Sequence, residues 1–498
     1  MELISAITPL EILLVVSGVM IGIVFGAIPG MTATMAVAVC LPMTYGLSLN
    51  NSLALLLGLY VGGISGGLVP AILINIPGTP SSITTTFDGH PMAQKGEAER
   101  ALKIGIVSSL IGGLFSAVVL FLFAPALADL AIKFSYVEKF LIILFALTII
   151  ASLSKNLLNG AISGVLGIWL SLVGTYDLNT GGNGDIRLVP GFLEDTLING
   201  FSLLPVLIGL FGLTVILEEA AKGVPPEPFS HFKLGDGKPF TFSVFRGHFG
   251  TLFRSSAIGT FVGLLPGIGG SAASVLAYAQ QKNLSKHPEL LGTGAPEGVM
   301  ASESSNNGLT GGALIPLVSL GIPGDSTTAV MIGAFTLQGL QVGPLFIGEH
   351  LDSWHEIMTN LVLANIVMFF VMFFAIRHIV KVIQVPKYLL YPLIVVMCAV
   401  GSYSANSGIM FDVWTFLLFG VFGYFGHKVG LESAPFIIGF ILGKDAEVYF
   451  VKSIESYGTL SIFFTKSPIA MGLWVLIALS LGYAFYQAYR TLRRESGR

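Results

Sequence analysis

Two short segments combine Pro-Gly with hydroxyl side chains, and they are the places where this chain could bind an anion. The first tip reads Ile76-Pro-Gly-Thr-Pro-Ser-Ser82, and the second tip reads Ile322-Pro-Gly-Asp-Ser-Thr-Thr328. Proline and glycine end one helix, and Ser or Thr then caps the next helix. The N-terminus of that helix offers free N–H groups and a partial positive charge, which suit a carboxylate or, equally, a phosphate. Capping alone also explains the hydroxyl groups, so both interpretations stay open.

Two related Pro-Gly turns occur earlier in each half of the chain, at Pro29-Gly30 and Pro266-Gly267. We expect all four turns to shape the backbone and the residues beside them to touch a ligand. The predicted substrate-binding residues are Gly30, Thr32, Gly78, Thr79, Ser81, Ser82, Gly267, Gly269, Gly324, Ser326, Thr327 and Thr328, and the predicted hinges are Pro29, Pro77, Pro266 and Pro323.

Oxygen-bearing side chains lie next to the same turns and could bind a cation. Hard cations such as Na⁺ prefer amide, hydroxyl and carboxylate oxygens, and an acidic residue inside a membrane is a functional candidate by default. A proton on Asp325 or Glu303 would serve as well. Asp88 and Glu303 could instead lie in loops at the water interface, which makes Asp325 the stronger candidate. The predicted coupling-ion residues, where Na⁺ would be held, are Asn75, Glu303, Asn306, Asn307 and Asp325.

Motifs of the common enzymes are missing from the sequence. His90 has no second His or Cys at metal-ligand spacing, and Cys40 and Cys398 lie in separate apolar segments. No P-loop, GxSxG or HExxH string occurs. The sequence therefore predicts no catalytic residue and no cofactor, and energy must come from an ion gradient or a partner.

The composition places these residues in a membrane. Of the side chains, 53% are apolar and 11% are charged, whereas a soluble domain carries about 25% charged residues. The mean hydropathy is +0.82. These values exclude a soluble enzyme and predict an all-α polytopic membrane protein with about 11–13 spans. Plain spans are expected near 101–127, 137–153, 156–174, 197–220, 357–380, 388–404, 408–426, 432–450 and 468–489, and broken or re-entrant helices over 10–87 and 255–340.

Basic residues predict the orientation of the chain. Lys and Arg gather near 95–103, in 222–254, near 377–387 and in the C-terminal tail. Short basic loops stay in the cytoplasm. The C-terminus is therefore predicted to be cytoplasmic, the N-terminus periplasmic and the acidic stretch 175–195 external.

An internal repeat relates the two halves. The frame GxxxGxxPG occurs at Gly22–Gly30 and recurs at Gly259–Gly267, and the segment that leads into the first tip recurs before the second tip at an offset of 246 residues. The loop after the first copy is basic and the loop after the second is acidic, so the copies are predicted to have opposite orientations. The predicted domains are a first repeat at 1–221, a cytoplasmic connector at 222–254, a second, inverted repeat at 255–450, and a C-terminal span and basic tail at 451–498.

These strings resemble the large membrane subunit of the tripartite tricarboxylate transporter family, known as TctA. One departure is His90, where the family pattern usually has Tyr. The resembling segments are Gly26-Ala-Ile-Pro-Gly30, Tyr60-Val-Gly-Gly-Ile-Ser-Gly-Gly67, Asn75-Ile-Pro-Gly-Thr-Pro-Ser-Ser82, Asp88-Gly-His-Pro-Met-Ala93, Gly263-Leu-Leu-Pro-Gly-Ile-Gly269, Ala295-Pro-Glu297, Glu303-Ser-Ser-Asn-Asn307 and Ile322-Pro-Gly-Asp-Ser-Thr-Thr-Ala-Val330.

The resemblance implies a carrier in the bacterial inner membrane. Such a carrier works with a small membrane subunit, TctB-like, and takes substrate from a periplasmic solute-binding protein, TctC-like. It imports tricarboxylates, dicarboxylates or aromatic acids with Na⁺ or H⁺. Under this hypothesis Asp325→Asn is expected to abolish or decouple uptake while leaving folding intact.

Two alternatives belong to other classes. A membrane-embedded enzyme could use Asp88, His90 and Glu303 on a lipid or isoprenoid substrate, and it would turn over without a gradient. A channel would need a continuous polar pore, which no predicted span offers. Gradient-dependent, saturable uptake would separate the carrier from both.

Overall fold

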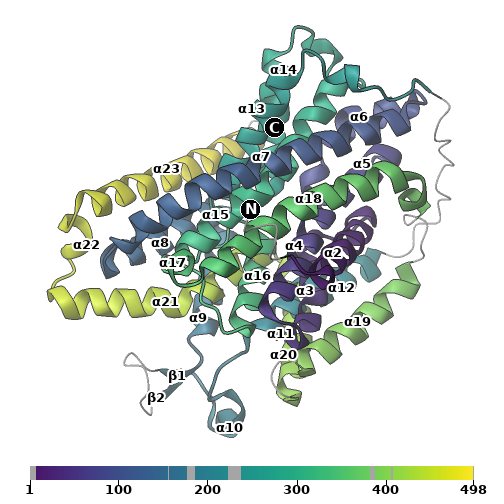
Figure 1. The fold of residues 1–498 in the computed structure, drawn as a ribbon. Coiled ribbons are helices and arrows are strands. Elements are labelled where there is room, and N and C mark those ends of the chain that lie inside the picture. The colour runs from purple at the N-terminus through teal and green to yellow at the C-terminus, as the bar shows by residue number, and fades with distance from the viewer. Residues whose placement is uncertain are drawn as a thin grey trace. The chain divides into compact units, whose positions relative to one another are not determined.

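The structure is a computed structural model, and it describes residues 7–154, 156–176, 185–222, 237–381, 387–404 and 408–496. It is almost entirely helical, as predicted (Figure 1). The chain divides into two compact units, the first made of Met1–Ala128 with Glu218–Met397 and the second of Asp129–Leu217 with Cys398–Arg498. Each unit thus takes a segment from both predicted halves. The domain boundaries proposed from the sequence follow the repeat rather than these units, and the repeat boundaries stay a prediction.

The first unit contains the four Pro-Gly turns. From the first half of the chain come α2 (Pro9–Ala27), α3 (Ala33–Cys40), η1 (Leu41–Gly46), α4 (Leu49–Gly66), α5 (Leu68–Ile74), η2 (Pro80–Ser82), α6 (Thr85–Gln94) and most of α7 (Ala98–Ile132). From the second half come η5 (Phe242–Phe245), α13 (Phe249–Leu264), α14 (Gly269–Leu284), η6 (Pro288–Leu290), α15 (Pro296–Leu320), α16 (Ser326–Leu337), α17 (Phe346–Glu349) and α18 (Leu351–Ile379).

The second unit is built from the remaining helices and one hairpin. Its elements are α8 (Tyr136–Leu153), α9 (Leu157–Ser171), β1 (Gly174–Tyr176), β2 (Asp185–Arg187), η3 (Gly191–Leu193), α10 (Glu194–Leu197), α11 (Leu203–Ile208), the π-helical turn η4 (Gly209–Leu213), α20 (Met410–Lys428), α21 (Ser433–Tyr457), α22 (Ile462–Thr465) and α23 (Pro468–Ser496). The unit boundaries cross α12 (Thr214–Lys222) and α19 (Lys387–Ser404) as well as the end of α7. Helices α21 and α23 pack along α8 (Figure 1).

The predicted membrane segments are confirmed as helices. Among the described residues, five helices are long and apolar enough to cross a membrane: Pro9–Ala27, Leu49–Ile74, Ala98–Ile132, Leu203–Lys222 and Leu351–Ile379. All nine plain spans expected from the sequence fall on helices. The total of about 11–13 spans stays a prediction.

Two connecting stretches differ in detail from the sequence-based expectation. The predicted external stretch contains the antiparallel pair β1 and β2, with Thr175 opposite Ile186, so a small hairpin interrupts the all-helical fold. Residues 177–184 lie outside the described residues. In the predicted connector 222–254, residues 223–236 also lie outside them, and α13 already begins at Phe249.

Glycine seams hold the paired helices of the first unit together. A Cβ on Gly22 would lie 2.5 Å from the Leu59 carbonyl oxygen of α4, and a Cβ on Gly62 of α4 would lie 2.3 Å from the Val19 oxygen of α2. Helices α13 and α15 meet in the same way, because a Cβ on Gly263 would lie 2.7 Å from the Leu309 oxygen. Small residues permit this backbone contact. The two copies of the sequence motif therefore build the same kind of helix pair, which supports the predicted repeat.

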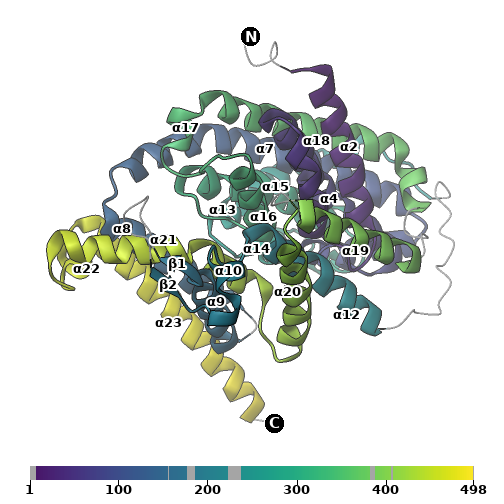
Figure 2. The ribbon, with the colours of Figure 1, turned by 90° about the horizontal axis from the view of Figure 1, so that it is seen from below.

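The core of the first unit surrounds α15. Side chains along nearly the whole helix are buried, from Gly298 to Ser319, and α4, α6, α13, α14 and α16 all pack against it (Figure 2). The buried surface includes the polar run Ser302–Asn307. A helix that buries so many polar groups needs partners for them, which directs attention to its neighbours.

Candidate functional site

The second tip is the capped start of α16. The Asp325 carboxylate is 7% exposed, and its Oδ1 atom accepts hydrogen bonds from the Thr328 backbone N–H at 2.7 Å and the Thr328 hydroxyl at 2.8 Å. The Asp325 N–H donates to the Thr328 hydroxyl oxygen at 2.9 Å, which completes a capping box. The helix N-terminus that the sequence offered to a ligand is thus occupied by its own side chain.

Helices of the first half reach across to this tip. The Tyr60 hydroxyl of α4 donates to Asp325 Oδ2 at 2.8 Å, and the hydroxyl oxygens of Thr34 in α3 and Thr327 in α16 lie 2.9 Å apart. All of these side chains are buried. Both Asp325 oxygens therefore have donors from the protein.

The first tip repeats this arrangement with hydroxyl groups alone. Thr79 Oγ1 lies 2.8 Å from Ser82 Oγ and 3.0 Å from Ser81 Oγ. The repeat offset of 246 residues aligns Thr79 with Asp325 and Ser82 with Thr328. Both tips thus link residues i and i+3, but only the second tip contains a carboxylate.

The carboxylate near the first tip belongs to Glu303 of α15. It is 0% exposed, and it accepts hydrogen bonds from the Thr85 hydroxyl of α6 at 2.5 Å and the Ser109 hydroxyl of α7 at 3.1 Å. Within the described part of the chain, no Lys, Arg or His forms an ion pair with it. A buried carboxylate without a basic partner must be protonated or balanced by a cation.

Asn306 and Asn307 follow on the next turn of α15. Asn307 Oδ1 accepts from the Ser65 hydroxyl of α4 at 2.6 Å. Asn306 is 0% exposed, and its amide interacts with the neighbouring Glu303 carboxylate. The hydroxyls of Ser302 and Ser305 are buried without hydrogen-bond partners. Of the predicted coupling-ion residues, the structure thus brings Glu303, Asn306 and Asn307 together.

The remaining two coupling-ion candidates lie apart from this cluster. Asp325 lies at the second tip as described above. Asn75 is exposed and adopts a left-handed conformation, with φ of 58°, at the C-terminus of α5. Asn is one of the few residues that tolerate this conformation, and the position of Asn75 is explained by ending a helix.

The early Pro-Gly turns differ from one another in what surrounds them. At the first, Gly30 has φ of +91° and a Cβ there would lie 2.6 Å from the Glu219 carboxyl carbon, while Thr32 caps α3 through the Met35 N–H at 3.1 Å. At the second, the Gly267 N–H donates to the Gly324 carbonyl oxygen at 2.8 Å, which joins this turn to the second tip. The start of α14 has no side-chain cap, and a Cβ on Gly269 would have open space around it.

The structure also places the other predicted residues. Pro29, Pro77, Pro266 and Pro323 all lie in the breaks between helices, Gly78 and Gly324 pack against the Gly26 and Gly263 carbonyl oxygens, and Ser326 begins α16. Hinge movement and substrate contact at these positions stay predictions.

Several contributing residues were not identified from the sequence. Tyr60 lies in a segment that carries the family resemblance but was given no role, Thr85 and Ser109 were not singled out, and all three matter because the fold brings them to Asp325 and Glu303. One signal was present for Tyr60, since the repeat offset aligns it with Asn306.

Asp88 is buried and lies in helix α6 rather than in a loop. Its Oδ1 atom accepts three backbone N–H groups, from Gly292 at 2.9 Å, Gly294 at 2.8 Å and Ala295 at 2.7 Å, and its Oδ2 accepts the Tyr278 hydroxyl at 2.8 Å. Asp88 thus fastens α6 to the loop before α15. His90, beside it, contacts the Ile72 carbonyl oxygen with Nδ1 at 3.1 Å.

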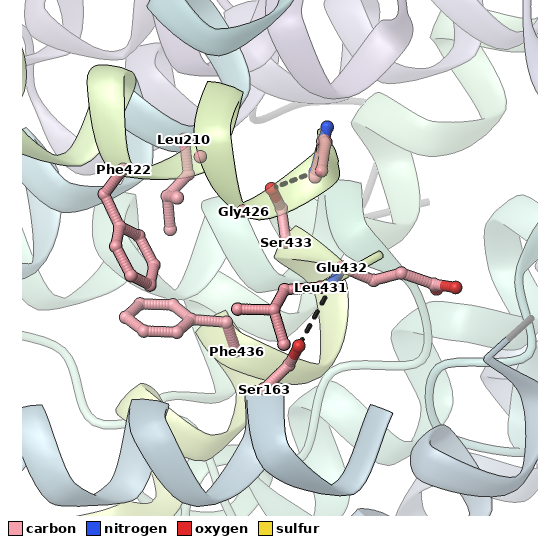
Figure 3. Close-up of a pocket in the computed structure, with 10 residues that line it drawn as sticks. Ser163, Leu210, Phe422, Gly426, Leu431, Glu432, Ser433 and Phe436 are labelled. Carbon is pink, nitrogen blue, oxygen red and sulfur yellow. Dashed lines mark hydrogen bonds between the residues drawn. The ribbon is translucent and has the colours of Figure 1, made fainter. Parts of the chain in front are cut away.

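One pocket of the second unit is small and lies around Ser433 and Phe436. Figure 3 shows Ser433 hydrogen-bonded to the neighbouring His427 ring at 2.9 Å, and the Ser163 hydroxyl accepting the Glu432 N–H at 3.1 Å. The cavity is about 10 Å³, roughly the space of one water molecule. It cannot hold an organic acid. Across the described residues, no group of three or more His, Cys, Asp or Glu side chains could hold a metal ion.

Comparisons with known proteins agree with these observations. The sequence model of the tripartite tricarboxylate transporter TctA family matches residues 12–438. The chain is 35% identical over 414 residues to an uncharacterized 52.8 kDa protein in the TAR-I ttuC' 3' region of Agrobacterium vitis, covering 82% of this chain and 80% of that one. It is 36% identical over 238 residues to an uncharacterized protein in the TAR-II ttuC' 3' region of the same organism, covering 48% of this chain and 98% of that one. No solved structure matches.

Proposed function

The chain belongs to the tripartite tricarboxylate transporter TctA family, and from this premise we propose that it is the large membrane subunit of a secondary active transporter that imports organic carboxylates. The family is a family of transporters and not of enzymes, so the enzymatic alternative has no support. The chain is a multi-pass membrane protein. Its partners under this proposal are a small TctB-like membrane subunit and a periplasmic TctC-like binding protein. Its location is the bacterial inner membrane, with the C-terminus in the cytoplasm.

The buried Glu303 carboxylate carries the proposal of ion coupling. It lies within a fully buried stretch of α15, and its partners among the described residues are the Thr85 and Ser109 hydroxyls and the Asn306 amide, all of them uncharged. Since an unpaired charge is costly in such a place, Glu303 would take up H⁺ or Na⁺ in each cycle. Asn306 and Asn307, one turn later, would supply amide oxygens to the same ion. Asp325 would bind an ion only by losing hydrogen bonds that it already accepts from Tyr60 and Thr328, so it is the weaker candidate for the coupling residue.

The arrangement of half-helices supports substrate binding in the same unit. Carriers with broken helices and repeated halves place substrate near the middle of the membrane, where half-helix N-termini face anionic groups. Two of the four Pro-Gly turns of the first unit are joined directly, because the Gly267 N–H donates to the Gly324 carbonyl oxygen at 2.8 Å.

Uptake into vesicles tests the proposal. The chain, its small partner and a binding protein would be reconstituted together, and labelled tri-, di- and aromatic carboxylates would be offered under an imposed Na⁺ or H⁺ gradient. Saturable uptake of one acid that depends on one gradient is the expected result. No uptake under either gradient, with an assembled complex, would refute the proposed function.

A matched pair of variants tests the role of Glu303. Glu303→Gln keeps a hydrogen-bond acceptor for Thr85 but cannot carry the charge, so uptake should lose its dependence on the gradient. Glu356→Gln is the control, because Glu356 is also a buried acid of the first unit and lies on α18, bonded to Asn360. Wild-type gradient dependence in Glu303→Gln would exclude Glu303 as the coupling group.

A further inference from the structure

Two charged side chains near the middle of α21 have no ion-pair partner among the described residues. Lys444 and Asp445 are both exposed, and the helix that carries them is 25 residues long. Glu447, on the next turn, differs because Arg187 of the hairpin binds it. Adjacent residues of a helix point about 100° apart, so the charged pair, Lys444 with Asp445, does not neutralise itself.

The charged pair lies beside the apolar part of a neighbouring predicted membrane span. The Phe450 ring of α21 packs on the Phe140 ring of α8, with centroids 5.3 Å apart. Further down, the Pro435 oxygen of α21 and the Leu147 Cδ2 atom of α8 lie 3.7 Å and 4.0 Å from the position that a Cβ on Gly164 would take. The charged pair lies between these two contacts along α21. It is therefore level with the stretch of α8 between them, in which every side chain is apolar.

Charged groups at this depth need a partner. An ionised side chain that faces lipid is costly, and such residues in membrane proteins pair with one another or face the interior of a bundle. The opposite side of α21 is already covered, since Gly439 packs against the Gly164 oxygen and Gly443 against the Ser171 hydroxyl of α9. The charged pair therefore marks the side of α21 where another protein segment binds.

This side of α21 has the pattern of a helix that pairs with a copy of itself. Ile441 and Val448 are seven residues apart and half-buried, so they form a seam along the helix. The charged pair flanks this seam, one residue on each side, because its members lie about 100° apart around the helix axis. Half-buried Lys452, which also lies over the Tyr136 ring at 5.6 Å, and exposed Glu455 flank the seam with the signs exchanged.

A second copy of the chain supplies the opposite charge at each of these positions. Two copies in one membrane have the same orientation, so their α21 helices run parallel. A two-fold axis between them makes residue i meet residue j while j meets i. Lys444 then meets Asp445 of the second copy, and Lys452 meets Glu455 of the second copy.

We propose that two copies of the chain associate through this seam, with Lys444 of each copy paired to Asp445 of the other. A small partner subunit would have to present matching charges of its own, whereas a second copy brings them by symmetry. The inference goes beyond the proposed function and does not depend on it.

An exchange of the two charges tests the pairing in the full-length chain. Lys444→Asp alone and Asp445→Lys alone each place like charges face to face, so each should raise the dissociation constant of the dimer by roughly 100-fold or more. The double variant restores opposite charges and should return the constant to the wild-type range. Energy transfer between separately labelled chains, diluted with lipid, measures the constant. Lys133→Asp is the matched control, since this exposed lysine also lacks an ion pair among the described residues and lies outside α21.

Cross-linking in membranes gives a readout that does not need the charge variants. In a chain whose buried Cys40 and Cys398 are replaced by Ala, Val448→Cys places two thiols across the seam, and oxidation should produce a disulfide-linked dimer. Val165→Cys is the matched control, because this valine of α9 is 63% exposed but lies away from the seam. It should remain monomeric.

Several results would overturn the proposal. A folded wild-type chain that stays monomeric in lipid, or a Val448→Cys chain that cross-links no better than Val165→Cys, would exclude a dimer at this seam. Single charge variants that dissociate the dimer without rescue by the double variant would exclude the reciprocal pairing. Single variants that keep the dimer but release a small membrane subunit would assign the surface to that subunit. Since none of these measurements uses uptake, their failure leaves the proposed function in place.

Discussion

Replacing Asp88 with Ala should weaken the first unit by removing the fastening between α6 and the loop before α15. The carboxylate binds three backbone N–H groups and one phenol. Gly292 is exposed, so water can replace its bond, whereas Ala295 is buried and Gly294 half-buried. An unsatisfied buried donor costs about 1–3 kcal/mol, and with two such N–H groups we expect Asp88→Ala to lower the free energy of unfolding by about 2–6 kcal/mol.

Asp88→Asn should be much milder and separates a structural role from a role in transport. The Asn oxygen can still accept the three N–H groups, and the Tyr278 hydroxyl can turn to accept from the new NH₂ group. We therefore expect a folded protein with nearly wild-type uptake. If Asp88 instead carried the coupling ion, Asp88→Asn would fold normally and fail to transport.

Heat inactivation in detergent and protease sensitivity of residues 285–295 would measure these effects. Asp88→Ala should lose its folded fraction at a lower temperature and should be cut faster within that loop, with Asp88→Asn close to wild type. Equal stability of Asp88→Ala and wild type would refute the structural role. Loss of uptake in a stable Asp88→Asn variant would show instead that Asp88 takes part in transport.

Three further substitutions give expected outcomes of different kinds. Asp325→Asn should keep α16 capped, because Asn caps as well as Asp, but should abolish or decouple uptake; wild-type uptake would remove Asp325 from the ion site. Gly26→Ala would place a Cβ 2.3 Å from the Gly63 oxygen, so overpacking should lower the free energy of unfolding by about 1–3 kcal/mol and with it the thermal midpoint. Gly46→Ala is the control and should leave the midpoint unchanged, because a Cβ there would have nothing within 4 Å. In the second unit, Arg187 binds both Glu447 oxygens, at 2.6 Å and 2.5 Å, and both side chains are partly exposed. A double-mutant cycle on unfolding should give a coupling free energy of about 1 kcal/mol or less, and zero coupling would show that the pair does not contribute to stability.

The helices and their breaks were the part that the sequence could predict. Apolar length identifies a span because backbone groups in lipid must be satisfied within the helix. Pro-Gly identifies a break because proline lacks an N–H and glycine tolerates positive φ, as at Gly30 with φ of +91°. The sequence did not predict the hairpin around Thr175 and Ile186, because a three-residue strand is too short to show an alternation of apolar and polar side chains.

The partners of the polar residues could not be predicted. Which side chain reaches Glu303 depends on how α6 and α7 pack against α15, and Thr85 and Ser109 are ordinary residues in sequence. The burial of Asp88 could not be predicted either, since three of its hydrogen-bond donors are backbone N–H groups, which every residue except proline possesses. The sequence identified the acids, and only the fold identified what they bind.

The bonds between the two halves bear on why both copies share one chain. In a symmetric dimer of identical subunits, every contact occurs twice, and a substitution on one side appears on the other. Here Tyr60 reaches Asp325, but the residues that the repeat aligns with them are Asn306 and Thr79. The second tip therefore has the Asp325 carboxylate where the first tip has the Thr79 hydroxyl. Two copies within one chain can diverge in this way, whereas the identical subunits of a symmetric dimer cannot.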